Sequence, residues 1–157
     1  MPGRPSPLDN EQCRQCTSFS DYVKSAKKKT ENGAVSDNVE KPRREDCPLD
    51  KDELGNKTWG LLHTMAAKYP DKPTVQDETS MKEFFIHFSR FYPCDHCAKD
   101  LRNDLKADPP QTKSQEALSQ WLCKLHNKVN IKIGKEEFDC SKVNERWRDG
   151  WLDGSCD

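Results

Sequence analysis

The sequence predicts an all-α domain of four helices and a short fifth helix, preceded by an N-terminal tail. Apolar residues recur at steps of three and four through most of residues 47–157, and no stretch alternates with period two for long enough to predict a strand. Residues 1–46 hold only two aromatic side chains, Phe19 and Tyr22, and none of the four tryptophans. Such a segment buries too little apolar surface to offset the entropy of ordering it, so we expect a mostly disordered tail.

Local signals bound the first two predicted helices. A helical pattern covers about 50–69 and ends at Pro70 and Pro73, which cannot continue a helix. Its expected inward residues are Trp59, Leu62 and Ala66. A second pattern covers about 75–92 and carries a wide apolar stripe that we expect to lie mostly in the core. The stripe comprises Met81, Phe84, Phe85, Phe88, Phe91 and Tyr92.

Pro93 separates the second predicted helix from the third. Proline is tolerated in the first turn of a helix, so a third helix is expected over about 94–107, and Pro109 and Pro110 stop it. Its inward side chains are expected to be Ala98, Leu101 and Leu105.

A fourth helix is expected over about 114–133, with Gly134 as its C-terminal cap. Its packing residues are expected to be Leu118, Trp121, Leu122, Leu125 and Val129. A final short helix is expected to begin near Ser141 and to fade at Gly150, with Val143 and Trp147 on it.

Composition excludes several function classes. The 157 residues carry a net charge of −1, so nothing in the overall charge favours a nucleic acid or an anionic membrane as partner. The longest nearly apolar stretch is too short to span a bilayer, and the N-terminus lacks the apolar core of a secretory signal. We therefore expect no nucleic acid and no membrane partner. Eight cysteines in such a chain are the first indication of its chemistry.

Two of the cysteine pairs have CxxC spacing. Cys94 and Cys97 lie at the start of the predicted third helix, where unpaired backbone N–H groups and the helix dipole lower the pKa of a thiol. Cys13 and Cys16 lie in the predicted tail. A dithiol on a moving segment beside a fixed one indicates a relay, because thiol–disulfide exchange requires one sulfur to reach the next.

Zinc binding is the alternative interpretation. Two CxxC pairs can supply four thiolates, and His96 is a further candidate ligand. Cys16 and Cys94 are, however, much farther apart than the roughly 15–20 residues of compact zinc modules. Spacing thus favours redox chemistry and no metal. A zinc-binding or disulfide-stapled signalling protein without catalysis is the second hypothesis.

The other four cysteines are single. A bridge between Cys123 and Cys140 would tie the fourth helix to the fifth and contribute roughly 3 kcal/mol by restricting the unfolded chain. Cys47 and Cys156 stand at the two ends of the predicted core. They could pair within a chain or between two chains, and the residues alone leave both pairings open.

A polar face of the fourth predicted helix suggests a nucleotide pocket between helices. Rings that stack, amides that donate and accept, and cations that pair with phosphate lie together there, although each residue alone is more often structural. No GxGxxG or GxxxxGK[ST] motif is present, which excludes a Rossmann or P-loop site. The residues concerned are Cys123, His126, Asn127, Asn130, Lys132 and Lys135, with Trp59 and His63 of the first helix and Trp147.

Two motifs make the chain resemble a known family. Tyr-Pro-Cys-Asp-His-Cys at 92–97, followed by His-Asn-Lys-Val-Asn at 126–130, resembles the Erv/ALR sulfhydryl oxidases. The similarity extends over about 45–157, and the Cys13–Cys16 pair is similar to the shuttle motif of the family's longer forms. The resemblance implies a four-helix bundle with a short fifth helix that holds FAD within the bundle. It also implies a division into a flexible tail over 1–46 and an FAD-binding oxidase domain over 47–157.

The resemblance implies roles for particular residues. Cys94 and Cys97 would be the active dithiol, with Cys97 next to the flavin and Cys94 exchanging with the shuttle pair. Cys13 and Cys16 would accept electrons from client proteins. Positions expected to line FAD are Gly55, Trp59, His63, Tyr92, Cys123, His126, Asn127, Val129, Asn130, Lys132, Lys135 and Trp147.

The resemblance further implies disulfides, partners and a location. Cys123 and Cys140 would form a structural disulfide, while Cys47 and Cys156 would form the intersubunit bridges of a homodimer. The implied activity is oxidation of thiols to disulfides, with O2 reduced to H2O2 or cytochrome c as acceptor. The implied client is the disulfide-carrier import receptor of the mitochondrial intermembrane space, where the chain would reside. The residues are equally compatible with an additional cytosolic or nuclear pool.

Overall fold

The structure, a computed structural model, describes residues 46–156. The predicted tail, with Cys13, Cys16 and the apolar pair Phe19 and Tyr22, lies outside the described residues. The chain divides into two compact units, 1–54 and 55–157, and the second contains nearly all of the described elements.

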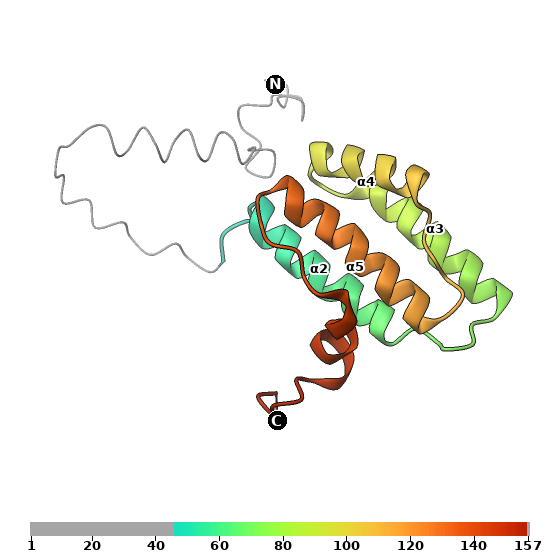
Figure 1. The fold of residues 1–157 in the computed structure, drawn as a ribbon. Helices are drawn as coiled ribbons and strands as arrows, with labels where there is room; N and C mark the ends of the chain where they lie inside the picture. The colour runs from blue at the N-terminus through green and yellow to red at the C-terminus, as the bar shows by residue number, and fades with distance from the viewer. Residues whose placement is uncertain (1–45, 157) are drawn as a thin grey trace, which may run out of the picture. The chain divides into compact units, whose positions relative to one another are not determined.

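Four α-helices and two short helical turns make up the described chain (Figure 1). They are α2 (Lys51–Ala67), α3 (Val75–Phe91), α4 (Asp95–Ala107), α5 (Gln115–Lys132), the 3-10 turn η1 (Cys140–Lys142) and the π-helical turn η2 (Glu145–Asp149). No strand occurs among residues 46–156. The all-α class and the order of the four long helices are therefore confirmed.

The predicted fifth helix is replaced by η1 and η2, which lie on either side of the buried Val143. So short a segment cannot sustain an α-helix by itself, because nucleation costs more than a few backbone hydrogen bonds return. Packing therefore decides its geometry, and a π-helical turn is an uncommon result that periodicity does not predict.

Side-chain caps explain where two of the long helices begin. At the start of α3, the Thr74 hydroxyl accepts from the Asp77 backbone N–H, and the Asp77 carboxylate accepts from the backbone N–H of Thr74, a reciprocal capping box. At the start of α5, the Ser114 hydroxyl accepts from the Ala117 N–H at 3.1 Å. Each cap pairs backbone donors that the first turn of a helix leaves unsatisfied.

The core of the second unit is organised around α5. Leu118 and Leu122 are 0% exposed, and Trp121 packs edge-on against Phe85 of α3 with ring centroids 4.9 Å apart. Fully burying a side chain of this size contributes roughly 1.5–3 kcal/mol. The whole cluster comprises Leu62, Ala66, Tyr69, Phe85, Leu105, Leu118, Trp121, Leu122 and Leu125.

One member of the predicted apolar stripe does not join this core. Phe91 is 78% exposed, and the guanidinium of Arg90 lies 5.9 Å from the centroid of its ring. Phe91 is the last residue of α3, and Tyr92 already has an extended backbone. The end of the helix thus carries Phe91 past the neighbours that cover the earlier phenylalanines.

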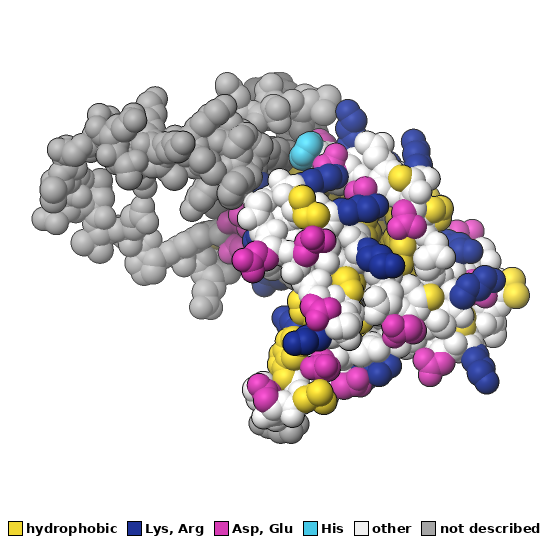
Figure 2. Space-filling view, in the orientation of Figure 1, with side chains coloured by type: hydrophobic (Ala, Val, Ile, Leu, Met, Phe, Trp, Pro, Cys, Tyr) yellow, Lys and Arg dark blue, Asp and Glu magenta, His cyan; other side chains and the backbone are white. Residues whose placement is uncertain are grey.

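After Gly134 the chain returns along α5 as a C-terminal strap, defined as residues 138–150, which runs beside α5 and α2 (Figure 1). On the face shown in Figure 2, acidic and basic side chains are interspersed over the described part of the chain. Within residues 46–156, no helix combines the length and apolar character needed to cross a membrane.

Candidate active site

The Cys94–Cys97 pair forms a disulfide at the N-terminus of α4. Cys94 is the N-cap residue, and its Sγ accepts from the Cys97 backbone N–H at a donor–acceptor distance of 3.4 Å. The sulfur therefore occupies the place that a serine or aspartate oxygen usually takes at a helix start. When the pair is reduced, the same N–H groups and the helix dipole stabilise a thiolate at this position.

The two sulfur-bearing residues differ in accessibility. Cys94 is 1% exposed, whereas Cys97 is partly exposed. A thiol that attacks Cys94 therefore requires its covering to move first. The assignment of exchange to Cys94 and of flavin contact to Cys97 stays a prediction.

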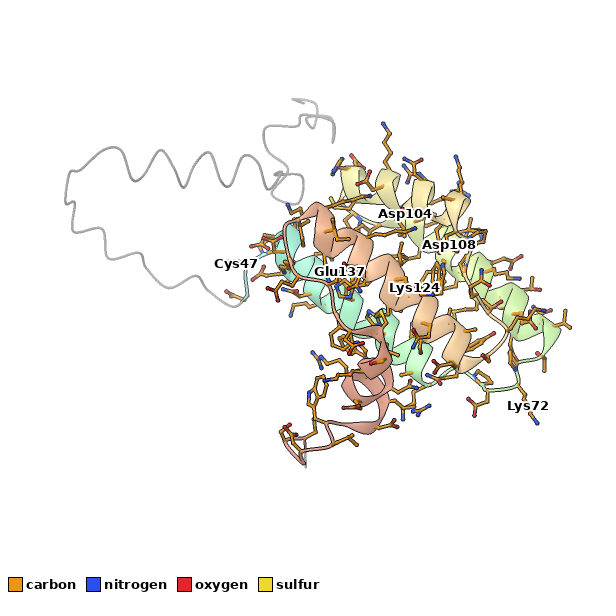
Figure 3. The ribbon with its side chains drawn as sticks, viewed as in Figure 1. Cys47, Lys72, Asp104, Asp108, Lys124 and Glu137 are labelled. Atoms are coloured by element: carbon orange, nitrogen blue, oxygen red, sulfur yellow. A yellow bond between two sulfur atoms is a disulfide. The ribbon has the colours of Figure 1, made fainter. Side chains whose placement is uncertain are left out.

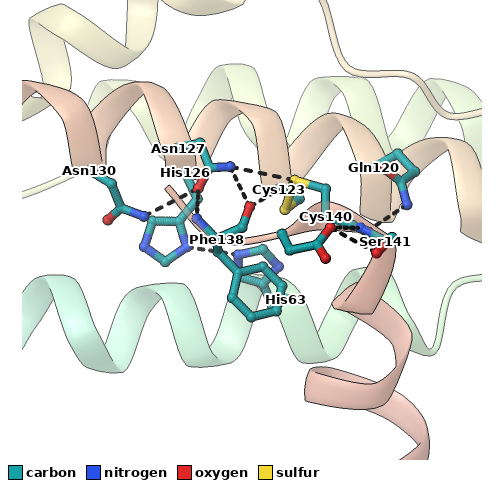
Figure 4. Close-up of a disulfide and its surroundings, with 10 residues drawn as sticks. His63, Gln120, Cys123, His126, Asn127, Asn130, Phe138, Cys140 and Ser141 are labelled. Atoms are coloured by element: carbon teal, nitrogen blue, oxygen red, sulfur yellow. Dashed lines mark hydrogen bonds between the residues drawn. A yellow bond between two sulfur atoms is a disulfide. The ribbon is translucent and has the colours of Figure 1, made fainter. Parts of the chain in front are cut away.

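A second disulfide, Cys123–Cys140, joins α5 to the strap, and amide side chains surround it (Figure 4). The Asn127 amide donates to the Phe138 carbonyl at 2.8 Å and accepts from the Phe138 N–H at 2.9 Å. Gln120 donates to the Cys140 carbonyl at 2.9 Å. Side chains of α5 therefore bind the backbone of Phe138 and of Cys140, and Cys123 binds the sulfur of Cys140. These contacts fix the start of the strap against α5.

Four aromatic rings from three elements gather beside this disulfide. The rings of Trp59 and His126 stack at 4.0 Å, and those of His63 and Trp147 stack at 4.7 Å. The two stacks are joined by a hydrogen bond between His63 Nε2 and His126 Nδ1 at 3.0 Å. Trp59 and His63 reach the cluster together because they are four residues apart on α2. The Arg146 guanidinium lies 4.3 Å from the centroid of the Trp147 ring.

Burial keeps both histidines neutral. Desolvation, aided by the charges of His126 and Arg146, lowers the pKa of His63 from 6.5 to about 3. Desolvation, aided by Lys135, lowers the pKa of His126 to about 4. In the hydrogen bond between the two neutral imidazoles, one ring nitrogen donates its proton and the other accepts it. The second ring nitrogen of His63, Nδ1, is buried and has no hydrogen-bond partner in the described chain.

The rings and amides line a cavity of about 470 Å³. Several of the predicted cofactor positions line it: Trp59, His63, Cys123, His126, Asn127, Asn130 and Trp147. Its surface combines flat rings with amide donors and acceptors, the composition of a small-molecule site. The chain thus builds a pocket for a planar, polar ligand from α2, α5 and the strap.

Other predicted positions lie outside the cavity lining. Gly55 has open space around the position of a Cβ, and Tyr92 is half-buried beside Thr58, with burial raising the pKa of its hydroxyl. Lys132 lies 3.4 Å from Asp100 and 3.6 Å from Asp104, two carboxylates of α4, of which Asp104 is labelled in Figure 3. The other two are Val129, which is partly buried, and Lys135, which is exposed.

The sequence analysis missed three residues of the cavity: Asn56, Phe138 and Arg146. Asn56 could have been found, because it lies one helical turn before Trp59 on the same face of α2. Phe138 and Arg146 belong to the strap, which has no periodicity from which their direction can be read.

The remaining cysteines and His96 do not line the cavity. Cys47 (Figure 3) and Cys156 carry free thiols, half-buried and exposed respectively. His96 is 75% exposed and lies 3.7 Å from Asp100. Among residues 46–156, no three His, Cys, Asp or Glu side chains are placed to hold a metal ion. A four-thiolate site would need the Cys13–Cys16 pair, which lies outside these residues.

Comparison with known proteins places the chain in a family. The Erv1 / Alr family model matches residues 56–148. The mitochondrial FAD-linked sulfhydryl oxidase ERV1 of Saccharomyces cerevisiae is 47% identical over 104 residues, which are 66% of this chain and 55% of that protein. The FAD-linked sulfhydryl oxidase ERV1 of Oryza sativa subsp. japonica is 49% identical over 114 residues, 71% of this chain and 58% of that protein.

The fold is also similar to solved structures. The crystal structure of the yeast Erv1 core superposes with a TM-score of 0.67 at 44% sequence identity, covering 74% of this chain and 99% of that chain. The chain spans only about half the length of the curated relatives it matches, 55% and 58% of the two described above. The residues that the family model matches, 56–148, are more than half of this chain. The chain therefore belongs to the Erv1/Alr family.

Proposed function

We propose that this chain is an FAD-dependent thiol oxidase that makes disulfides in client proteins. The observation that carries the proposal is the Cys94–Cys97 disulfide at the N-terminus of α4, in a fold whose relatives are named FAD-linked sulfhydryl oxidases. Helix-terminal CxxC pairs have the lowered thiol pKa that rapid exchange requires. A disulfide that only stabilises the fold gains nothing from the lowered thiol pKa at a helix N-terminus.

The cavity fits a flavin dinucleotide. His63 Nδ1 is buried and lacks a partner, so a polar atom of a ligand would complete its hydrogen bonding. The neighbouring rings offer flat apolar faces to an adenine or a flavin, and Asn130 offers an amide oxygen, whereas both ends of the Asn127 amide are paired with Phe138. Arg146 and Lys135 supply positive charge for a pyrophosphate. The residues proposed to hold FAD are those lining the cavity, with Gly55, Tyr92, Val129, Lys132 and Lys135 around it.

The chemistry divides between the chain and the cofactor. A client dithiol attacks the Cys13–Cys16 disulfide, which leaves the client oxidised and the tail pair reduced. Cys13 and Cys16 then reduce Cys94–Cys97 by a second exchange, with Cys94 as the attacked sulfur and Cys97 as the leaving thiolate. When bound, FAD would supply the two-electron acceptor for the Cys94–Cys97 dithiol, with O2, reduced to H2O2, or two molecules of cytochrome c as the final acceptor.

The assembly and location belong to the same proposal. A homodimer linked through Cys47 and Cys156 is supported by the free thiols of both residues, one of them exposed. Relatives in two yeasts are named mitochondrial oxidases, which supports a mitochondrial location. We propose the intermembrane space in particular, with the disulfide-carrier import receptor of that compartment as client. The chain would have a tail over 1–46 and an oxidase domain over 47–157.

An anaerobic dithiol titration of the purified protein tests the proposal. We expect the visible absorbance band of oxidised flavin, and we expect two electrons per chain to bleach it. A colourless protein that takes up no FAD would contradict the proposal and favour the zinc-binding or disulfide-stapled alternative.

The relay is tested by Cys13→Ser. We expect turnover of a small dithiol to be unchanged, because such a dithiol reaches the folded domain directly, and turnover of a protein client to fall at least about tenfold. The measurement is oxygen consumption with each substrate, and Ser18→Ala in the same segment is the control. Equal losses with small and large substrates would show that Cys13 and Cys16 are not a shuttle.

A further inference from the structure

The strap enters the cavity far from the disulfide that anchors it. Trp147 stacks on His63 within the cavity, yet Cys140 is the nearest covalent tie to α5. Between them lie η1 and η2, two turns too short to be stable by their own backbone hydrogen bonds. Some other contact must therefore hold η2 so that Trp147 faces His63.

Gln115, the first residue of α5, makes that contact. It is 3% exposed, and its Nε2 donates to Asn144 Oδ1 and to Ser119 Oγ, both at 2.9 Å. Its Oε1 accepts from Arg148 Nη1 at 3.1 Å. The residues that Gln115 binds on the strap, Asn144 and Arg148, flank Trp147 in sequence. One buried amide thus grips η2 on both sides of the tryptophan.

The strap residues of this contact are themselves held in place. Asn144 Nδ2 donates to Glu116 Oε2 at 3.2 Å, and Arg148 pairs with Asp149 through two hydrogen bonds of 2.8 and 3.0 Å. The buried Gln115 amide stabilises the contact between α5 and η2 because its nitrogen and its oxygen are both hydrogen-bonded. Removing one of its partners would leave a buried polar group of Gln115 without a hydrogen bond, which is unfavourable.

We propose that Gln115, Asn144 and Arg148 form a latch that positions Trp147 for FAD retention. Gln115 does not line the cavity, so it acts through Trp147 and is a positioning residue. The latch rests on the proposed function, because it assumes that the ring-lined cavity is the FAD site. When the latch is broken, η2 moves away from α5 and one wall of the cavity opens, while the core around Leu118 and Leu122 is unchanged.

The test compares variants of the FAD-loaded protein. Gln115→Met keeps the volume of the side chain and removes its three hydrogen bonds, and Asn144→Ala removes the strap side of one of them. We expect each variant to release FAD about five- to tenfold faster, measured as the recovery of flavin fluorescence after dilution. We also expect faster hydrogen exchange in residues 143–149 and unchanged exchange in α3.

Tyr69→Phe is the matched control. It removes one buried hydrogen bond, from the Tyr69 hydroxyl to the Thr112 carbonyl at 3.1 Å, and neither partner of that bond is a strap residue. It should lower thermal stability about as much as Gln115→Met and leave FAD release unchanged. The double variant of Gln115 and Asn144 should release FAD no faster than the faster single variant, because both changes break the same connection.

The outcomes separate the latch from the function beneath it. Unchanged FAD release in Gln115→Met, or equal acceleration by Tyr69→Phe, would overturn the latch. Trp147→Ala tests the underlying site and is expected to accelerate release at least as much. If Trp147→Ala released FAD normally, the cavity would not be the FAD site and the latch would fail with it, whereas the oxidase activity is tested separately by the flavin titration. If Trp147→Ala released FAD faster but the Gln115 and Asn144 variants released it at the wild-type rate, only the latch would be overturned.

Discussion

The two disulfides of the described chain involve the same bond in very different surroundings. Cys94–Cys97 spans three positions at the first turn of α4, with Cys97 partly exposed and a backbone N–H directed at Cys94 Sγ. Cys123–Cys140 spans 17 positions and joins two elements, with Cys123 2% exposed and its partner next to the Asn127 amide. The first constrains little of the chain, whereas the second constrains the whole strap.

This comparison indicates that neighbouring groups, not the cysteines themselves, make the first pair suited to thiol exchange and the second suited to joining two elements. A short bridge at a helix start can open without unfolding anything, and the N–H groups there stabilise the thiolate that results. A long bridge between two elements gains from loop closure, so opening it costs stability.

Cys97→Ser should have the largest consequence. Without the second sulfur the active pair can neither close nor deliver two electrons, so turnover of any dithiol should fall about a thousandfold or more. FAD content should stay close to wild type, because serine has nearly the same size and shape as cysteine. Stopped-flow bleaching of the flavin band measures the rate, and the absorbance ratio of flavin to protein is the control. Substantial residual bleaching would disprove the role of this pair.

The paired variant Cys123→Ala and Cys140→Ala should have the opposite profile. The free energy of unfolding should fall by roughly 3 kcal/mol through loss of loop closure. FAD should dissociate faster as the strap loosens, while flavin that remains bound is still bleached by dithiols. Denaturant unfolding and single-turnover bleaching measure the two effects. If bleaching were lost with flavin still bound, this disulfide would belong to the electron path and the comparison would not hold.

Acidification should affect the strap side and spare the dithiol side. The pKa of His63 is about 3 and that of His126 about 4 in the folded protein, both below the unfolded value of 6.5. The unfolded state therefore binds more protons as pH falls through 6.5, so the free energy of unfolding decreases from there down to the folded pKa values. The charged groups that act on the pair are Arg146, beside His63, and Lys135, beside His126, and both lower the histidine pKa in the same direction as burial.

Denaturant unfolding between pH 7.5 and pH 4.5 measures this slope. His126→Gln should flatten the slope relative to wild type. A wild-type slope in His126→Gln would show that the pair is not the titrating element.

Much of this fold could be predicted because its signals are local. The helix starts at Thr74 and Ser114 follow from caps within three residues of each, and the stops follow from the prolines and from Gly134, whose φ of 75° suits glycine. The disulfide at Cys94–Cys97 is equally local. Phe91 was wrongly expected in the core, because periodicity does not reveal where a helix ends relative to its neighbours.

The candidate site was predictable only in part, because its members come from three elements. The pairs Trp59 and His63, and His126 and Asn130, share helical faces and were found by spacing. Arg146 and Phe138 were missed, since nothing in an irregular strap indicates which way a side chain points. Lys132 was expected to line FAD, yet its ammonium lies between two carboxylates of α4, a choice of neighbours that sequence spacing cannot show.

Residue order alone was enough to establish the helical class, the approximate limits of α2 to α5 and the helix-terminal dithiol, because caps, prolines and apolar periodicity act over a few residues. The stacking of Trp59 on His126 and of Trp147 on His63, the unpaired His63 Nδ1 and the grip of Gln115 on η2 depended on packing in three dimensions. These contacts join residues many positions apart, and their geometry exists only once α2, α5 and the strap have buried one another's surfaces.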